Sequence, residues 1–477
     1  MDYINKGCCR EAERAEIVAL GLDQLRLALP VSFHTHLIAL TEEIRSSSRL
    51  LRDLADRSQV HISRVPIVLN HLGVLLPCLC KTLRDITTYY EDKTLSREIR
   101  WRKMYNKMTE EAGGLPLPNR FVLYNNFLSL LKQLLTRSPN FDLNSLEALR
   151  TRLLALREQR GIPPPPVQSG PLIRQDLMSL AVVQEPNAHW AEQIFSLPLP
   201  SRTALKHPRS SKSYGPFFPW GHLNIPAEPK ILFRRPFDND KISIVVFLNS
   251  VDQSPYILMR TIQGGNPWFS MYGVHELCIG REGSALQLKR WSRSEQASKL
   301  WAALYFLTWE EMVLFYCTFV ALKARNMLTV QIHPNEFKLQ REKRLFQAQI
   351  IDDGYKHSLI VYEDLQTRGI RLHAAVWEGE LRQCPVWTAF VTHQSQSPTW
   401  LSRRSRHRVW LKDVQLYVFC KTYRQESMRQ NKSGAFELYF VSEEGAKRFR
   451  EVFSITTTSP GTSGASGVSE PAAGPSK

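Results

Sequence analysis

The densest group of cationic side chains lies between residues 403 and 412, where five lysine and arginine residues occur within ten positions. Such a cluster can hold acidic lipid, phosphate or nucleic acid by electrostatic attraction. It also fits a nuclear-import patch, or a solvated loop ahead of a strand that begins at Val409. The candidate anion- or membrane-binding residues are Arg403, Arg404, Arg406, Arg408 and Lys412.

Two tryptophans, Trp400 and Trp410, flank this cluster. Aromatic rings beside arginines can stack on nucleic-acid bases, whereas a tryptophan at a strand edge is commonly packed in a core. Both interpretations remain open at the level of sequence.

Sequence signatures of catalysis and of metal binding are missing. The chain has no phosphate-binding G-x-x-x-x-G-K-[ST], no H-E-x-x-H and no G-x-S-x-G. His34 and His36 are two residues apart, as are Cys78 and Cys80, and such a spacing on a helix points to different faces. Neither pair joins a second pair at zinc spacing. We expect no catalytic residue, no metal, no cofactor and no small-molecule substrate.

The composition sets broad limits. A chain of 477 residues predicts two to four domains. The net charge of +17 favours anionic partners, but the excess is spread along the chain. Eight sparse cysteines without framework spacing favour a reducing compartment, and no secretory pattern follows Met1. We expect a cytoplasmic protein, peripheral at a membrane through its basic cluster, with a nuclear location as the alternative.

Residues 1–160 predict an all-α helical bundle. Prolines mostly fall at the edges of the apolar segments, where a helix tolerates them; Pro77 is the exception and predicts a kink or break. Asp142 or Asn144 is expected to cap the last helix. The expected helices are 10–28, 35–57, 62–90, 95–111, 118–137 and 142–160.

Two segments have a different composition. Residues 161–230 begin with the run Pro163–Pro166 and are rich in proline, which favours extended backbone. We expect this segment to be a linker that separates the core of the helical bundle from the cores that follow. Residues 456–477 are mainly Ser, Gly, Thr, Ala and Pro and are expected to form a disordered tail.

Residues 231–330 and 336–455 each predict several antiparallel strands followed by one amphipathic helix. Glycines and polar turns punctuate both regions. The expected strands are Lys241–Leu248, Tyr256–Thr261, Trp268–Ile279, Leu286–Trp291 and Leu300–Phe306 in the first, and Leu345–Ile351, Ser358–Tyr362, Ile370–Trp377, Trp387–Thr392, Val409–Cys420 and Phe436–Val441 in the second. The closing helices are Trp309–Ala324 and Glu443–Phe453.

This repeated arrangement resembles the pleckstrin-homology (PH) superfold, in which a bent antiparallel barrel is plugged by a C-terminal helix. The segment Phe436–Phe453 looks like the last strand and helix of such a domain. The whole chain is similar to uncharacterised fungal proteins with a helical front half and a PH-like back half. The resemblance implies an α+β multidomain protein: a helical bundle followed by two PH-like antiparallel β-barrels, each closed by a C-terminal helix.

Lipid-binding members of that family carry basic residues across the first hairpin, and this sequence departs from the pattern. The hairpin loop expected at Asn249–Ser254 has no base, and only Arg260 follows it. In the second copy Asp352 and Asp353 lie near Lys356, and carboxylates there would repel a phosphate. We therefore expect a non-catalytic scaffold or adaptor that binds a protein partner through its PH-like domains, with weak contact to acidic phospholipid. The alternatives are a basic nucleic-acid-associated nuclear protein and an enzyme with an unrecognised site.

Overall fold

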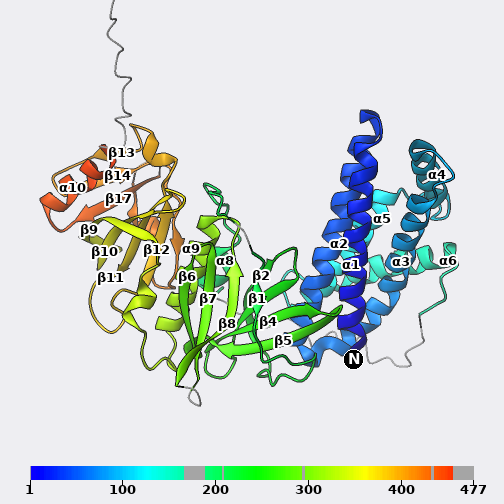
Figure 1. The fold of residues 1–477 in the computed structure, drawn as a ribbon, viewed down its shortest axis with the longest axis horizontal. Coiled ribbons are helices and arrows are strands. Elements are labelled where there is room, and N and C mark those ends of the chain that lie inside the picture. Colours follow the sequence, from blue (N-terminus) through cyan, green and yellow to red (C-terminus); the bar gives the residue numbers. More distant parts are fainter. Residues whose placement is uncertain (1, 166–187, 207–208, 293–295, 431–433, 455–477) are drawn as a thin grey trace, which may run out of the picture. The chain divides into compact units, whose positions relative to one another are not determined.

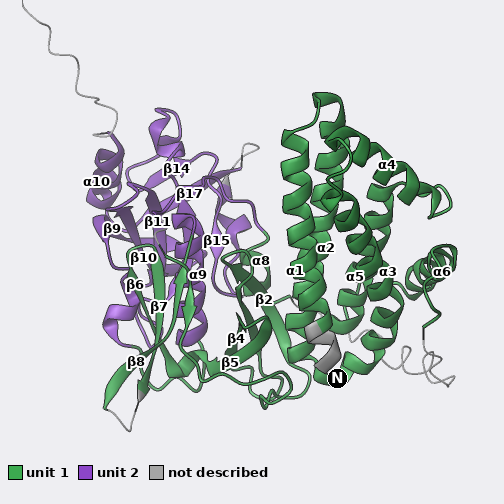
Figure 2. Cartoon of the chain, turned by 45° about the vertical axis from the view of Figure 1, so that its right-hand side comes forward, with its two compact units in different colours: residues 1–196, 207–306, 325–332 green, residues 197–206, 307–324, 333–477 purple. Residues whose placement is uncertain are grey.

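The computed structural model describes residues 2–165, 188–206, 209–292, 296–430 and 434–454. The chain divides into two compact units (Figure 2). The first contains residues 1–196, 207–306 and 325–332, and the second contains residues 197–206, 307–324 and 333–477.

The N-terminal region is helical, as predicted. Its long helices run side by side and bury a leucine-rich core (Figure 1). Each expected segment corresponds to an observed helix, with ends that mostly agree within a few residues. The helices are α1 (Asp2–Leu27), α2 (His34–Val60), α3 (Val65–Glu91), α4 (Arg97–Glu110), α5 (Leu117–Thr136) and α6 (Leu143–Gln159).

Helix α3 continues through Pro77, so the predicted break is absent. Residues 62–91 are long and apolar enough to cross a membrane, but half of the most apolar window is buried inside the protein. Arg160, the residue after α6, places its Nη2 2.5 Å from Asp85 Oδ2 of α3. Arg157 of α6 donates to the backbone carbonyl oxygens of Gly73 and Val74 in α3. These contacts are those of a core helix in a bundle.

The first unit also holds two four-stranded antiparallel sheets. One has the order β2 (Lys230–Phe237), β3 (Ile242–Leu248), β4 (Pro255–Gln263), β5 (Asn266–Gly273), and the other the order β1 (Lys212–Ser213), β8 (Ala297–Tyr305), β7 (Ala285–Ser292), β6 (Leu277–Glu282). Among the described residues no strand of one sheet pairs with a strand of the other. The expectation of a closed barrel is therefore wrong here.

Strand β2 was not predicted. Pro236 and the adjacent Arg234 and Arg235 interrupt the apolar alternation that marks a strand. The proline is tolerated because β2 is an edge strand: it has a neighbouring strand on one side only, so an N–H on its other side would form no ladder hydrogen bond. The first hairpin turn is consequently the one between Phe237 and Ile242, and the turn at Asn249–Ser254 is the second.

The second unit holds one large sheet that is open as well, because its end strands β13 and β15 do not pair with each other in the described residues. The order is β13 (Leu401–Arg403), β14 (Arg408–Leu411), β17 (Ala435–Phe440), β9 (Glu342–Asp352), β10 (Tyr355–Asp364), β11 (Ile370–Val376), β12 (Pro385–Phe390), β15 (Tyr417–Val418), with β16 (Arg429–Gln430) beside β17. The single strand expected at Val409–Cys420 splits in two. Asp413 between the halves adopts a left-handed φ of 53°, which ends an extended strand.

Helix α10 (Glu443–Ser454) packs on the second sheet, as expected for a closing helix. Phe449 and Phe453 are buried, and their rings lie 5.4 Å from Phe346 and 4.9 Å from Trp400 respectively. Val452 is only half-buried.

Helix α9 (Trp309–Ala324) was expected to close the first set of strands. Leu314, Phe315 and Leu322 are buried as predicted. The helix nevertheless belongs to the second compact unit, where the ring of Trp309 lies 5.3 Å from that of Phe390 in β12.

The proline-rich window contains ordered elements in its described part. Helix α8 (Trp190–Ile194) is followed by β1, which pairs with β8, and by a bridge between Phe218 and Phe269 of β5. Residues 166–187 of the expected linker and the expected tail at 456–477 lie outside the described residues.

Candidate functional site

The structure brings the predicted cationic side chains together on the hairpin of β13 and β14, in which Arg403 pairs in register with Val409. Their side chains are exposed on this hairpin, which ends the sheet of the second unit. The arginine hairpin is formed by Arg403, Arg404, Arg406 and Arg408, and the nearby Lys412 is exposed too.

The two tryptophans that flank the cluster both contact other side chains of the second unit; Trp410 is half-buried. Trp400 is buried against Phe453. The ring of Trp410 is held by a hydrogen bond from Nε1 to Glu437 Oε2 of 2.8 Å, and the Arg404 guanidinium lies 3.7 Å from its centroid. Neither ring is therefore presented for base stacking.

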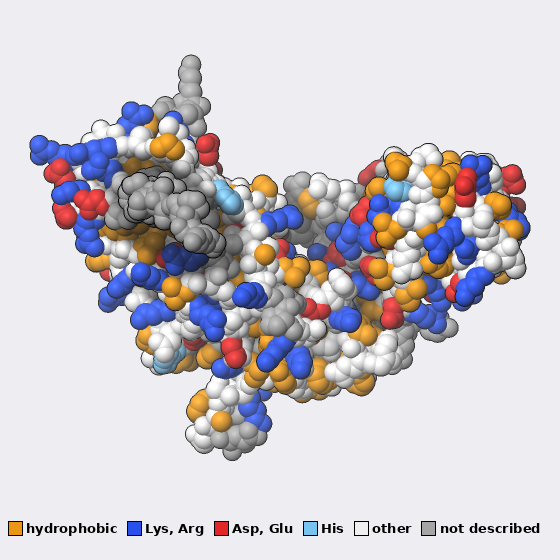
Figure 3. Space-filling view, turned by 45° about the horizontal axis from the view of Figure 1, so that its top comes forward, with side chains coloured by type: hydrophobic (Ala, Val, Ile, Leu, Met, Phe, Trp, Pro, Cys, Tyr) orange, Lys and Arg blue, Asp and Glu red, His pale blue; other side chains and the backbone are white. Residues whose placement is uncertain are grey.

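Acidic neighbours only partly offset the arginine hairpin. Arg403 Nη2 lies 3.4 Å from Glu443 Oε1, and Arg408 Nη1 lies 3.8 Å from Glu437 Oε1. Exposed pairs of this kind are worth roughly 0–1 kcal/mol each, so they leave the arginines available. Arg406 has no ion pair within the described residues. Lysines and arginines are also scattered elsewhere over the visible surface (Figure 3).

The arginines beside the first hairpin of the first unit are neutralised internally. Arg234 Nε lies 2.6 Å from Asp56 Oδ2, and Arg260 Nε binds the other oxygen of the same carboxylate. Asp240 accepts from both guanidinium groups, at 2.6 and 2.8 Å, and Ser243 donates to Asp56 at 2.6 Å. Burial opposes the charge, but Arg260 and Arg234 hold the pKa of the Asp56 carboxyl below its usual value.

This network has two consequences. Arg234 and Arg260 are each paired with both Asp56 and Asp240, so a phosphate would have to compete with two buried carboxylates. In addition, Asp56 lies on α2, so the network joins the helical bundle to β2, β3 and β4. The bundle and these strands belong to one compact unit.

The close His and Cys pairs do not form a metal site in the described residues. His34 Nε2 lies 3.0 Å from a backbone carbonyl oxygen, and Cys78 is buried in the bundle core. No group of three or more His, Cys, Asp or Glu side chains is arranged to hold a metal within the part of the chain that the structure describes.

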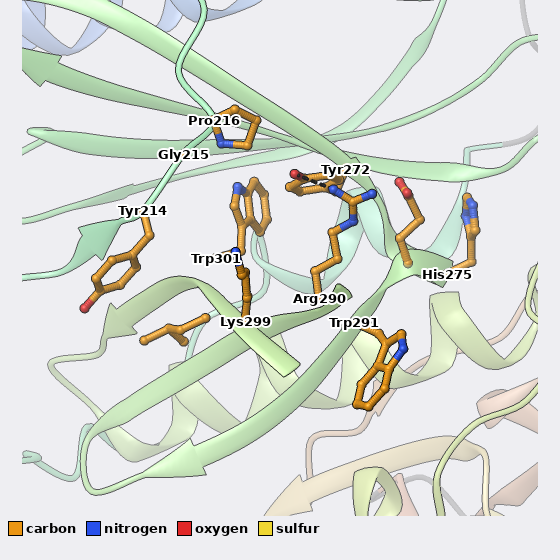
Figure 4. Close-up of a pocket in the computed structure, with 11 residues that line it drawn as sticks. Tyr214, Gly215, Pro216, Tyr272, His275, Arg290, Trp291, Lys299 and Trp301 are labelled. Atoms are coloured by element: carbon orange, nitrogen blue, oxygen red, sulfur yellow. Dashed lines mark hydrogen bonds between the residues drawn. The ribbon is translucent and has the colours of Figure 1, made fainter. Parts of the chain in front are cut away.

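A cavity of about 1000 Å³ opens on the surface of the first unit and combines aromatic with cationic side chains (Figure 4). Sequence reasoning missed it because its residues come from four separate segments. We call this cavity the aromatic groove. Its aromatic and cationic lining residues are Tyr214, Tyr272, Arg290, Trp291, Lys299 and Trp301.

One wall of the aromatic groove is fixed. Trp301 Nε1 donates to Ser270 Oγ at 2.8 Å, and its ring meets that of Tyr272 edge-on at 5.2 Å. The Arg290 guanidinium lies 4.6 Å from the Tyr272 ring centroid, and its Nη1 donates to the Tyr272 hydroxyl at 2.9 Å. These contacts preorganise the wall for a ligand.

Two other aromatic residues of the groove are exposed. Tyr214 and Trp291 expose 53% and 55% of their surface. Tyr214 N donates to Trp301 O at 2.9 Å, just after β1 pairs with β8. The edge of β8 beside the groove is therefore covered by a segment of the same chain.

Comparison with known families agrees with this architecture. Residues 221–342 and 343–458 match the two family models for PH domains found in tandem in fungal proteins. The C-terminal half therefore carries two PH domains in tandem, and the N-terminal half is helical. A comparison with curated proteins gives no match. Tandem PH domains are consistent with a scaffold or adaptor that binds protein or lipid.

Proposed function

We propose that the protein is a non-catalytic scaffold or adaptor that binds a protein partner through its PH domains. The aromatic groove is the observation that carries this proposal. Exposed Tyr214 and Trp291 supply apolar area, while Arg290 and Lys299 add a cationic rim. Aromatic residues and arginine are enriched where proteins bind one another.

Lipid recognition at the first hairpin of the first PH domain is disfavoured by the same structure. Arg234 and Arg260 are committed to Asp56 and Asp240. A phosphoinositide would have to displace a buried carboxylate, and leaving that carboxylate unpaired is costly.

The second PH domain adds weak contact with an acidic membrane through the arginine hairpin. Each basic side chain near an anionic surface contributes about 1 kcal/mol, and the attraction falls off within a Debye length. The contact is therefore salt-sensitive and shows little preference among anionic lipids. We propose on this basis a cytoplasmic location, peripheral at a membrane.

The nuclear, nucleic-acid-associated alternative has less support. In that alternative, Trp400 and Trp410 were expected to stack on nucleic-acid bases, and both rings instead contact side chains of the second unit. Phosphate attraction alone remains, and it does not distinguish nucleic acid from membrane.

Partner binding at the aromatic groove is tested by removing its two exposed rings. Tyr214→Ala together with Trp291→Ala should abolish enrichment of at least one protein when the full chain is purified from cells and analysed by quantitative mass spectrometry. Tyr355→Ala is the control, because Tyr355 is also an exposed aromatic residue, at 66%, but belongs to the second unit. Identical sets of co-purified proteins for the double variant and the control would contradict the proposal.

A further inference from the structure

The first unit contains a second cavity, of about 640 Å³, where α2 and α5 end beside the start of β2. It is separate from the aromatic groove and shares no lining residue with it. We call it the junction cavity. Its lining includes Arg57, His61, Arg64, Arg137, Glu228 and Lys230.

The lining of the junction cavity is cationic. Four lysine and arginine side chains face two carboxylates, Glu192 and Glu228, which leaves 4 − 2 = +2. Arg57 is paired with Asp53 at 2.6 Å, and Lys230 with Glu192 at 3.3 Å. Once Asp53 is counted with Arg57, the net charge is +1, and it lies at Arg64 and Arg137, which face Glu228 alone.

These two arginines share a single carboxylate oxygen. Arg64 Nη2 and Arg137 Nη1 both reach Glu228 Oε2, the latter at 3.3 Å. Arg64 Nη1 also donates to Leu135 O at 2.9 Å, which satisfies a carbonyl at the end of α5 and fixes the guanidinium. Glu228 itself is 44% exposed, so its carboxylate can leave the arginines and turn to solvent.

Several nitrogens around the cavity lack a hydrogen-bond partner among the described residues: His61 Nδ1, Arg64 Nε and Arg137 Nε. His61 and Arg64 are 5% and 7% exposed, so water in bulk does not satisfy them. Burial, followed by the charges of Arg64, Arg57 and Arg137, lowers the pKa of His61 to about 3. A bound anion would accept hydrogen bonds from the two arginine Nε–H groups.

We infer that the junction cavity binds a small molecule that carries two or more phosphate groups, and that Glu228 occupies the position of one phosphate when the ligand is absent. The planar arginine fork matches phosphate oxygens in pairs. The volume lies in the range of small-molecule sites. The inference does not depend on partner binding at the aromatic groove.

Isothermal titration calorimetry of the full chain tests this inference with pyrophosphate and inositol 1,4,5-trisphosphate, with citrate as a carboxylate comparison. Arg137→Gln should weaken binding about tenfold, the value of one charge-assisted contact. Glu228→Gln should tighten it at least threefold, because it removes the competing carboxylate. Arg45→Gln is the control, since Arg45 forms ion pairs with Asp23 and Glu42 elsewhere on the bundle.

Opposite shifts for Arg137→Gln and Glu228→Gln support the site, because a general folding defect would weaken both. Co-sedimentation with vesicles containing phosphatidylinositol 4,5-bisphosphate separates a lipid headgroup from a soluble phosphate. Either source fits the inference if Arg137→Gln weakens the binding. No heat with either phosphate compound and no vesicle binding overturns it, as does equal weakening by Arg137→Gln and Arg45→Gln.

Discussion

Replacing Asp56 by asparagine should destabilise the bundle and the first PH domain together. The Asp56 carboxylate is fully buried and carries contacts from Arg234, Arg260 and Ser243. The substitution leaves Arg260, which is 2% exposed, with Asp240 as its carboxylate partner, and Arg234 with Asp240 and the more distant Asp53 at 4.0 Å. Breaking a buried ion pair on one side costs about 3–5 kcal/mol.

Hydrogen exchange measured by mass spectrometry shows which segments lose this stability. At about 1.4 kcal/mol per factor of ten, exchange should accelerate roughly 10²- to 10³-fold in peptides from both α2 and β3. Asp23→Asn is the matched control, because Asp23 also pairs with two arginines, Arg26 and Arg45, but is 27% exposed and should lose less than about 1 kcal/mol. Acceleration confined to α2, or equal in the two variants, would refute the shared network.

Three further outcomes are expected. Phe449→Ala should lower the unfolding free energy by roughly 3–5 kcal/mol. Val452→Ala should lower it by less, because Val452 is half-buried. A denaturant midpoint of Phe449→Ala equal to that of the unsubstituted protein would show that α10 is not packed. Burial and Arg150 lower the pKa of His71 to about 4, so the unfolded chain takes up a proton below pH 6.5 that the folded chain refuses. His71 alone should make the unfolding free energy fall by up to about 1.4 kcal/mol per pH unit between pH 6.5 and 5. The pKa values of His61 and His357 are lowered as well, to about 3 and about 4, so His71→Met should reduce the slope by its own share, without abolishing it, in denaturant titrations at several pH values. In liposome co-sedimentation of the full chain, binding to anionic vesicles should weaken about a thousandfold, and fade with salt, when glutamate replaces Arg403, Arg404, Arg406 and Arg408.

The helices were predictable because their signals are local. Phe121, Phe127 and Leu131 repeat on one face of α5, and all are buried. Asp142 accepts from the backbone N–H groups of Asn144 and Ser145, which decides the cap of α6. Signals within one turn of a helix need no knowledge of distant contacts.

The binding features were less predictable because they are non-local. The arginine hairpin is contiguous in sequence, so its residues could be named in advance. Asp56 and Arg234 are 178 positions apart, and nothing near either residue indicates the other. The aromatic groove depends on the segment around Tyr214 lying beside Trp301, although that segment was expected to be a linker.

The central claim, that a protein partner binds at the aromatic groove, is tested most directly by site-specific photo-cross-linking. A benzophenone amino acid replaces Trp291 in the full chain, and a second sample carries it in place of Tyr355. We predict that irradiation in cells links at least one protein to position 291 and not to position 355. Absence of any product above the unirradiated sample at position 291, or the same products at both positions, would contradict the claim.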